Sequence, residues 1–107
     1  MRIDITGRHM EITPSLREYV ERKINKVVKF LPTLRDARVI MYIEKVDHIV
    51  EAIISGNGVS FHSIEKANDM YSSVDQLVRK IEKQIVKYKE KHFEHKSIPP
   101  GEWKIEE

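Results

Sequence analysis

Two segments of the chain carry basic residues at helical spacing, and the chemistry that these residues could perform is the binding of phosphate groups. Residues 79 to 96 hold seven basic and three acidic residues, and residues 13 to 31 hold five basic and two acidic ones. Side chains three or four residues apart share one face of a helix. We therefore expect a cationic surface that follows the phosphates of a folded RNA. The predicted RNA-binding residues are Arg22, Lys26, Lys29, Arg79, Lys80, Lys83, Lys87 and Lys91.

The simplest alternative is that these cations only keep two amphipathic helices soluble. Solvated helix faces usually mix Glu and Lys at a spacing of four residues. The series Lys80, Lys83, Lys87 and Lys91 contains no acidic residue, and the first basic segment repeats the same preference. The pattern therefore favours a surface that binds an anionic partner.

Other candidate chemistry is sparse. The chain has no Cys, so disulfides and cysteine zinc sites are excluded. His92 and His95 are three residues apart, but without a third ligand they indicate ordinary exposed histidines. Patterns typical of nucleophile elbows, phosphate loops and zinc proteases are absent. We expect no enzymatic activity, no cofactor, no metal and no small-molecule substrate.

The basic segments must be positioned by helices and strands that the sequence also indicates. Alternating polar and apolar residues predict strands over residues 2 to 6, 38 to 45 and about 59 to 65, with a further strand around residues 50 to 54. A bend is expected at residues 46 to 48, and Gly56-Asn57-Gly58 is typical of a hairpin turn. Which face of the last strand is buried stays open, because Val59 and Phe61 compete with His62 and Ile64.

Two amphipathic helices are predicted. Thr13 is expected to cap the first, over residues 14 to 31, with Pro14 at its first position. Asn68 or Asp69 is expected to cap the second, which runs to about residue 94. The predicted buried stripe of the second helix consists of Met70, Val74, Leu77, Val78, Ile81, Ile85 and Tyr88.

The order β-α-β-β-β-α indicates an α+β fold, in which two helices cover one face of a four-stranded mixed sheet. The opposite face is left open and should carry Ile40 and Tyr42. Residues 1 to 96 are expected to form the binding domain, and residues 97 to 107 a flexible acidic tail. Apolar runs are too short for a membrane span or a signal peptide, so we expect a soluble cytoplasmic protein without a membrane partner.

Several short motifs resemble those of one known family. They are Ile3-Asp4-Ile5-Thr6-Gly7-Arg8, Met10-Glu11-Ile12-Thr13-Pro14, Asp69-Met70-Tyr71 and Arg79-Lys80-Ile81-Glu82-Lys83-Gln84. In order and spacing they are similar to the ribosome hibernation promoting factor and ribosome-associated inhibitor family, also called the sigma-54 modulation protein family, over about residues 1 to 93. The chain resembles its short form, without the C-terminal domain that long members add.

The resemblance implies the same β-α-β-β-β-α fold. It also implies a factor of the stress response that silences idle ribosomes by occupying the mRNA and tRNA channel of the small ribosomal subunit. The partner would be ribosomal RNA. The resemblance assigns RNA contacts to Arg22, Lys26, Lys80, Lys83, Lys87 and Lys91.

Two other functions remain open. The chain could be a protein interaction module that self-associates weakly through the open sheet face, with its cations serving only solubility. It could also be a general double-stranded RNA-binding domain, because its α-β-β-β-α portion has the topology of that domain.

Overall fold

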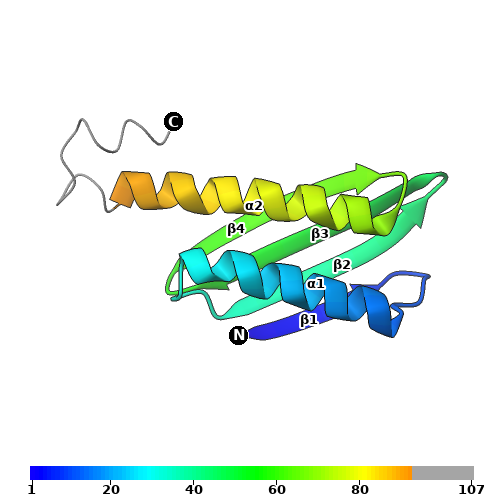
Figure 1. Ribbon diagram of the computed structural model, residues 1–107, viewed down its shortest axis with the longest axis horizontal. Coiled ribbons are helices and arrows are strands. Elements are labelled where there is room, and N and C mark those ends of the chain that lie inside the picture. The colour runs from blue at the N-terminus through cyan, green and yellow to red at the C-terminus, as the bar shows by residue number, and fades with distance from the viewer. Residues whose placement is uncertain (93–107) are drawn as a thin grey trace.

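The computed structural model describes residues 1 to 92, which form one sheet covered on one face by two helices (Figure 1). Strand order in the sheet is β1-β2-β3-β4, with β1 parallel to β2 and the other pairs antiparallel. The predicted β-α-β-β-β-α order and mixed sheet are confirmed. The elements are β1 (Arg2–Gly7), α1 (Pro14–Val27), the 3-10 turn η1 (Val28–Phe30), β2 (Asp36–Glu44), β3 (Asp47–Gly56), β4 (Val59–Ala67) and α2 (Met70–His92).

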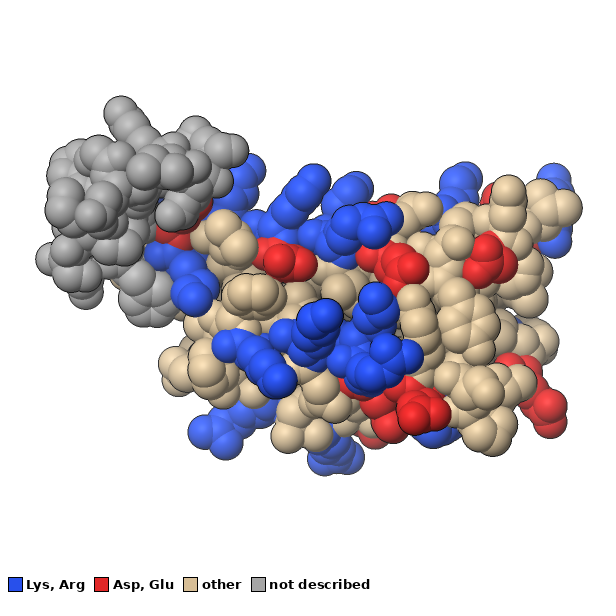
Figure 2. Space-filling view, in the orientation of Figure 1, with Lys and Arg blue, Asp and Glu red and all other residues tan. Residues whose placement is uncertain are grey.

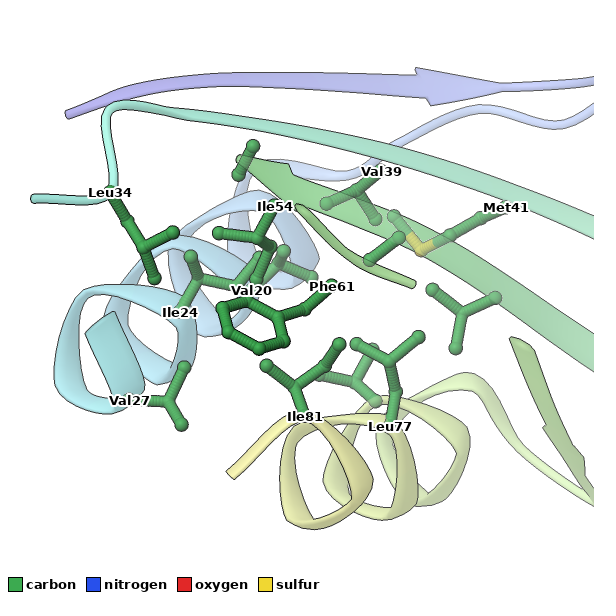
Figure 3. Close-up of a cluster of buried hydrophobic side chains, with 14 of the residues drawn as sticks. Val20, Ile24, Val27, Leu34, Val39, Met41, Ile54, Phe61, Leu77 and Ile81 are labelled. Atoms are coloured by element: carbon green, nitrogen blue, oxygen red, sulfur yellow. The ribbon is translucent and has the colours of Figure 1, made fainter. Parts of the chain in front are cut away.

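The core lies between the helices and the sheet face beneath them. The strand register places Val39 opposite Ala52, so inward side chains form rows across the strands. Ile24 from α1 and Ile81 from α2 converge around Phe61 of β4 (Figure 3). Full burial of one such side chain stabilises the fold by about 1.5 to 3 kcal/mol. This packing fixes how the two basic helices lie relative to each other.

The open sheet face carries Ile40 and Tyr42, as predicted, because the residue between them faces the helices. On β4 the structure decides which face is buried. Phe61 is 5% exposed and points to the core, whereas Ile64 is 49% exposed on the open face. The sequence alone did not decide which face of β4 is buried, because both faces of this strand carry hydrophobic residues.

Two predicted boundaries are wrong by a few residues. The first helix is α-helical only to Val27 and ends in η1, because Pro32 disfavours helical backbone at Leu31. The expected bend at residues 46 to 48 is a tighter turn at Lys45 and Val46, and β3 already begins at Asp47. The Gly56-Asn57-Gly58 hairpin is confirmed, with positive φ at its last two residues.

The capping residues lie where the sequence predicts them. Thr13 Oγ1 accepts a hydrogen bond from the Leu16 backbone N–H at 3.2 Å. At α2 the cap is Asp69, whose carboxylate accepts the backbone N–H of Ser72 at 3.0 Å and its hydroxyl at 2.8 Å.

The predicted stripe of α2 faces the core, with Val78 and Tyr88 partly buried at its margins. Ser73 was not predicted in the stripe, but it is fully buried and its hydroxyl donates to the His48 carbonyl oxygen at 2.5 Å. A small side chain lets α2 approach β3 closely at this point. The end of α2 expected at residues 93 and 94, the limit of the binding domain at residue 96 and the predicted tail at residues 97 to 107 lie outside the described residues.

The Asp69 cap makes a pH-dependent contribution to stability. The hydrogen bond from the Ser72 backbone N–H, followed by the one from its hydroxyl, lowers the pKa of Asp69 below its ordinary value of 3.8. Because the folded pKa is the lower one, this stabilisation is complete above pH 3.8 and disappears as the pH falls through the folded pKa.

In Asp69→Asn the amide oxygen still caps the helix, but the group no longer titrates. We expect urea unfolding midpoints of this variant to fall less on acidification below about pH 3.8 than those of the unmodified protein. The same dependence on pH in both proteins would contradict the assigned role of the carboxylate.

Candidate nucleic-acid interface

The α2 row, which we define as Lys80, Lys83, Lys87 and Lys91, lies on the side of α2 that is turned away from α1. Two contacts to β4 fix this orientation. Gln84 Nε2 donates to the His62 carbonyl oxygen at 2.9 Å, and Lys80 Nζ lies 3.4 Å from Glu65 Oε2. The row therefore runs along the outer border of the helix layer.

The lysines of the α2 row are not equally available to a partner. Lys80 forms an ion pair with Glu65, whose side chain is only 17% exposed. Lys83, Lys87 and Lys91 are exposed, and within residues 1 to 92 none of them has a carboxylate at ion-pair distance. These three lysines are better placed than Lys80 to bind a phosphate, because binding breaks no existing ion pair.

The α1 row, which we define as Arg22 and Lys26 of α1 together with Lys29 of the adjoining η1, consists of exposed side chains. Arg22 is held by aromatic contact, since its guanidinium lies 5.2 Å from the centre of the Tyr19 ring. The Tyr19 ring in turn packs edge-to-face on Tyr71 with their centres 4.9 Å apart. The packed Tyr19 and Tyr71 rings therefore support the position of the Arg22 side chain.

Tyr19 also connects the two helices. Its hydroxyl donates to Asp75 of α2 at 2.5 Å, and this hydrogen bond, together with burial, raises the pKa of Tyr19 above its ordinary value of 10.0. Lys23 Nζ lies 3.5 Å from the same Asp75 carboxylate. Tyr19 therefore stays protonated near neutral pH and ties α1 to α2 beneath the cations.

An interhelical groove separates the two rows. Its walls carry Lys26 from α1, Lys29 from η1 and Arg79 from α2, and its apolar lining includes Val78 and Phe30. Arg79 lies beside the α2 row, as expected, because it lines a surface hollow together with Lys80, Lys83 and Lys87. It also lines the interhelical groove and so faces the α1 row.

Acidic residues divide the basic surface. Asp75 and Glu82 line the groove, and Figure 2 shows red side chains between the blue ones over α1 and those along the far side of α2. Sequence reasoning considered only the series of lysines and missed this acidic row. The seven-residue spacing of Asp75 and Glu82, which places them on one helix face, was the signal that could have revealed it.

A third group of cations was also missed. Arg8, Arg17 and Arg38 line a shallow hollow at the β1 edge of the sheet. The Arg8 guanidinium lies 4.7 Å from the centre of the Tyr42 ring. The spacing of residues along the sequence could not have revealed this group. The three arginines come from three separate parts of the chain, and only the fold brings them together.

The histidines offer no metal site in the part of the chain that is described. Within residues 1 to 92 no group of three His, Cys, Asp or Glu side chains could hold a metal ion. The His92 ring stacks on Tyr88 with centres 4.1 Å apart. His95 lies outside the described residues. In the same range, no helix is long and apolar enough to cross a membrane.

The sequence of this chain is similar to one protein family and to individual proteins with established names. Residues 3–92 match the family described as Sigma 54 modulation protein / S30EA ribosomal protein. The chain is 34% identical over 95 residues to a ribosome hibernation promoting factor from Klebsiella oxytoca, which covers 89% of this chain and 100% of that protein. It is 35% identical over 95 residues, with the same coverage, to the ribosome hibernation promoting factor of Escherichia coli strain K12.

Solved structures agree with the sequence matches. A ribosomal subunit interface protein from Coxiella burnetii aligns with a TM-score of 0.79 at 34% identity, over 83% of this chain and 98% of that one. The N-terminal domain of Thermus thermophilus Protein Y aligns with a TM-score of 0.75 at 26% identity, over 82% of this chain and 99% of that one. The likeness therefore extends across most of the sheet and both helices.

Proposed function

This chain belongs to the Sigma 54 modulation protein / S30EA ribosomal protein family, and on that premise we propose that it silences translation by occupying the mRNA and tRNA channel of the small ribosomal subunit. It would act as a ribosome hibernation factor in the cytoplasm, through binding rather than through a reaction. The family is one of ribosome-associated factors and not of enzymes.

The observation that carries the proposal is the match of nearly the whole described domain to proteins named ribosome hibernation promoting factor. Two basic rows on one side of the sheet support it, because lysine and arginine neutralise RNA phosphates and displace their counterions. Lys83 and Lys87 of the α2 row and Lys26 of the α1 row are exposed and ready for such contacts. A channel lined by ribosomal RNA offers phosphates to both rows at once.

The test is co-sedimentation of the purified protein with separated small and large ribosomal subunits at increasing salt. We expect selective binding to the small subunit, with each phosphate contact adding about 0.7 to 0.9 to the slope of log affinity against log salt. Absence of small-subunit binding at low salt would refute the proposal.

Two results would favour the alternatives instead. A salt-insensitive dimer with no affinity for RNA would favour self-association through the open sheet face, where Ile53 and Ile64 are exposed. Equal affinity for any RNA duplex would favour a general double-stranded RNA-binding domain.

A further inference from the structure

Phe30 is a large aromatic side chain that the core does not enclose. It ends η1 and remains 41% exposed, whereas the nearby Leu31 and Leu34 are 6% and 5% exposed and fill the core at this end of α1. Within residues 1 to 92, Phe30 has no ring contact with another aromatic side chain, unlike Tyr19 and Phe61. The exposed part of this ring is therefore open to contact with a partner.

The surroundings of Phe30 are those of a charged groove. Phe30 lines the interhelical groove together with Lys26, Lys29 and Arg79, which come from both sides of it. Val78 adds apolar surface beside the ring. The groove thus offers an aromatic platform with cations around it, over the part of the molecule where Figure 2 shows blue side chains above α1.

The acidic groups of the groove restrict what can bind there. Asp75 is already engaged by the Tyr19 hydroxyl and by Lys23. Glu82 is partly buried and has no ion pair within the described residues. The negative charge of this carboxylate does not favour phosphate binding. A carboxylate can, however, accept a hydrogen bond from the exocyclic amino group of a nucleobase.

We propose that the interhelical groove binds one unpaired nucleotide of the ribosomal RNA, whose base stacks on Phe30 while Lys26, Lys29 and Arg79 hold the adjoining phosphates. Stacking on an aromatic ring is the usual way in which proteins hold unpaired bases. Glu82 lies where it can accept a hydrogen bond from the amino group of the base. The inference rests on the proposed function and adds a contact that charge alone does not provide.

The test compares Phe30→Leu with Phe30→Tyr in binding to small ribosomal subunits across a salt series. Leucine preserves apolar contact but removes the ring, so its affinity should fall about tenfold at every salt concentration with an unchanged salt slope. Tyrosine keeps the ring face and should bind like the unmodified protein. Lys29→Gln is the comparison variant, and it should reduce the slope because it removes a phosphate contact.

Urea unfolding of each variant shows whether its fold is intact. Affinity of Phe30→Leu equal to that of the unmodified protein would overturn the stacking inference, and so would equal losses in the leucine and tyrosine variants. Either result leaves the proposed function standing if the unmodified protein binds. Failure of the unmodified protein to bind small subunits would overturn both.

Discussion

Replacement of Lys83 and Lys87 together by Glu should lower the affinity for the small ribosomal subunit by at least about 100-fold, because two charge-assisted hydrogen bonds of roughly 1.5 to 3 kcal/mol each are lost. The new carboxylates would also repel the phosphates that the lysines are proposed to bind. Equilibrium binding to purified small subunits at fixed salt measures the effect.

The same double variant should fold normally. Lys83 and Lys87 are exposed, and neither has an ion pair within residues 1 to 92 that the substitution would break. Lys80 is less suitable for this experiment, since Glu at that position would face Glu65, whose carboxylate now lies 3.4 Å from Lys80 Nζ. Urea unfolding midpoints of the variant and the unmodified protein are therefore expected to agree closely.

A matched control separates the position of the charges from their number. Arg35→Glu combined with Lys45→Glu changes the net charge by the same amount, at exposed residues in loops outside both helices. We expect this control to bind far more tightly than the Lys83→Glu, Lys87→Glu variant. Equal losses in the two double variants would mean that only overall charge matters, and would remove the α2 row from the proposed interface.

Local periodicity made much of the fold predictable from the sequence. The spacing of Leu16, Val20 and Ile24 allows only a helix with one buried face, and the helix caps and the hairpin glycines reinforce the same element order. Agreement between local preferences and the global fold is typical of sequences that specify one structure.

Features that depend on tertiary contacts were harder to predict from the sequence. Complete burial of Ser73 follows from the approach of α2 to β3, and the hydrogen bond to the His48 carbonyl oxygen compensates for burial of its hydroxyl. The sequence cannot show which serine of a helix meets a neighbouring strand. For the same reason the ion pair between Lys80 and Glu65 could not be predicted.

The candidate site was predicted as a set of cations but not as an arrangement. Helical spacing identified both rows, whereas their separation by Asp75 and Glu82 depends on how the two helices are rotated on the sheet. Phe30 was counted within the first predicted helix. It becomes a feature of the groove only because the chain leaves the α-helix at Val28, ahead of Pro32.

The proposed occupancy of the channel predicts mutual exclusion between this protein and the ligands of the channel. A protein that fills the mRNA and tRNA channel cannot bind a small subunit that already holds these ligands. For simple competition, tRNA and mRNA at ten times their own dissociation constant should raise the apparent dissociation constant of the protein about tenfold, with further increases in proportion to their concentration.

The most direct measurement of the central claim is therefore binding of the labelled protein to small ribosomal subunits, with and without prior loading of mRNA and tRNA. An RNA hairpin of similar length that does not enter the channel serves as the control for nonspecific competition. Exclusion of the protein by mRNA and tRNA, but not by the hairpin, is the result expected from channel occupancy. Simultaneous binding of the protein and both ligands, with the affinity of the protein unchanged, would contradict it.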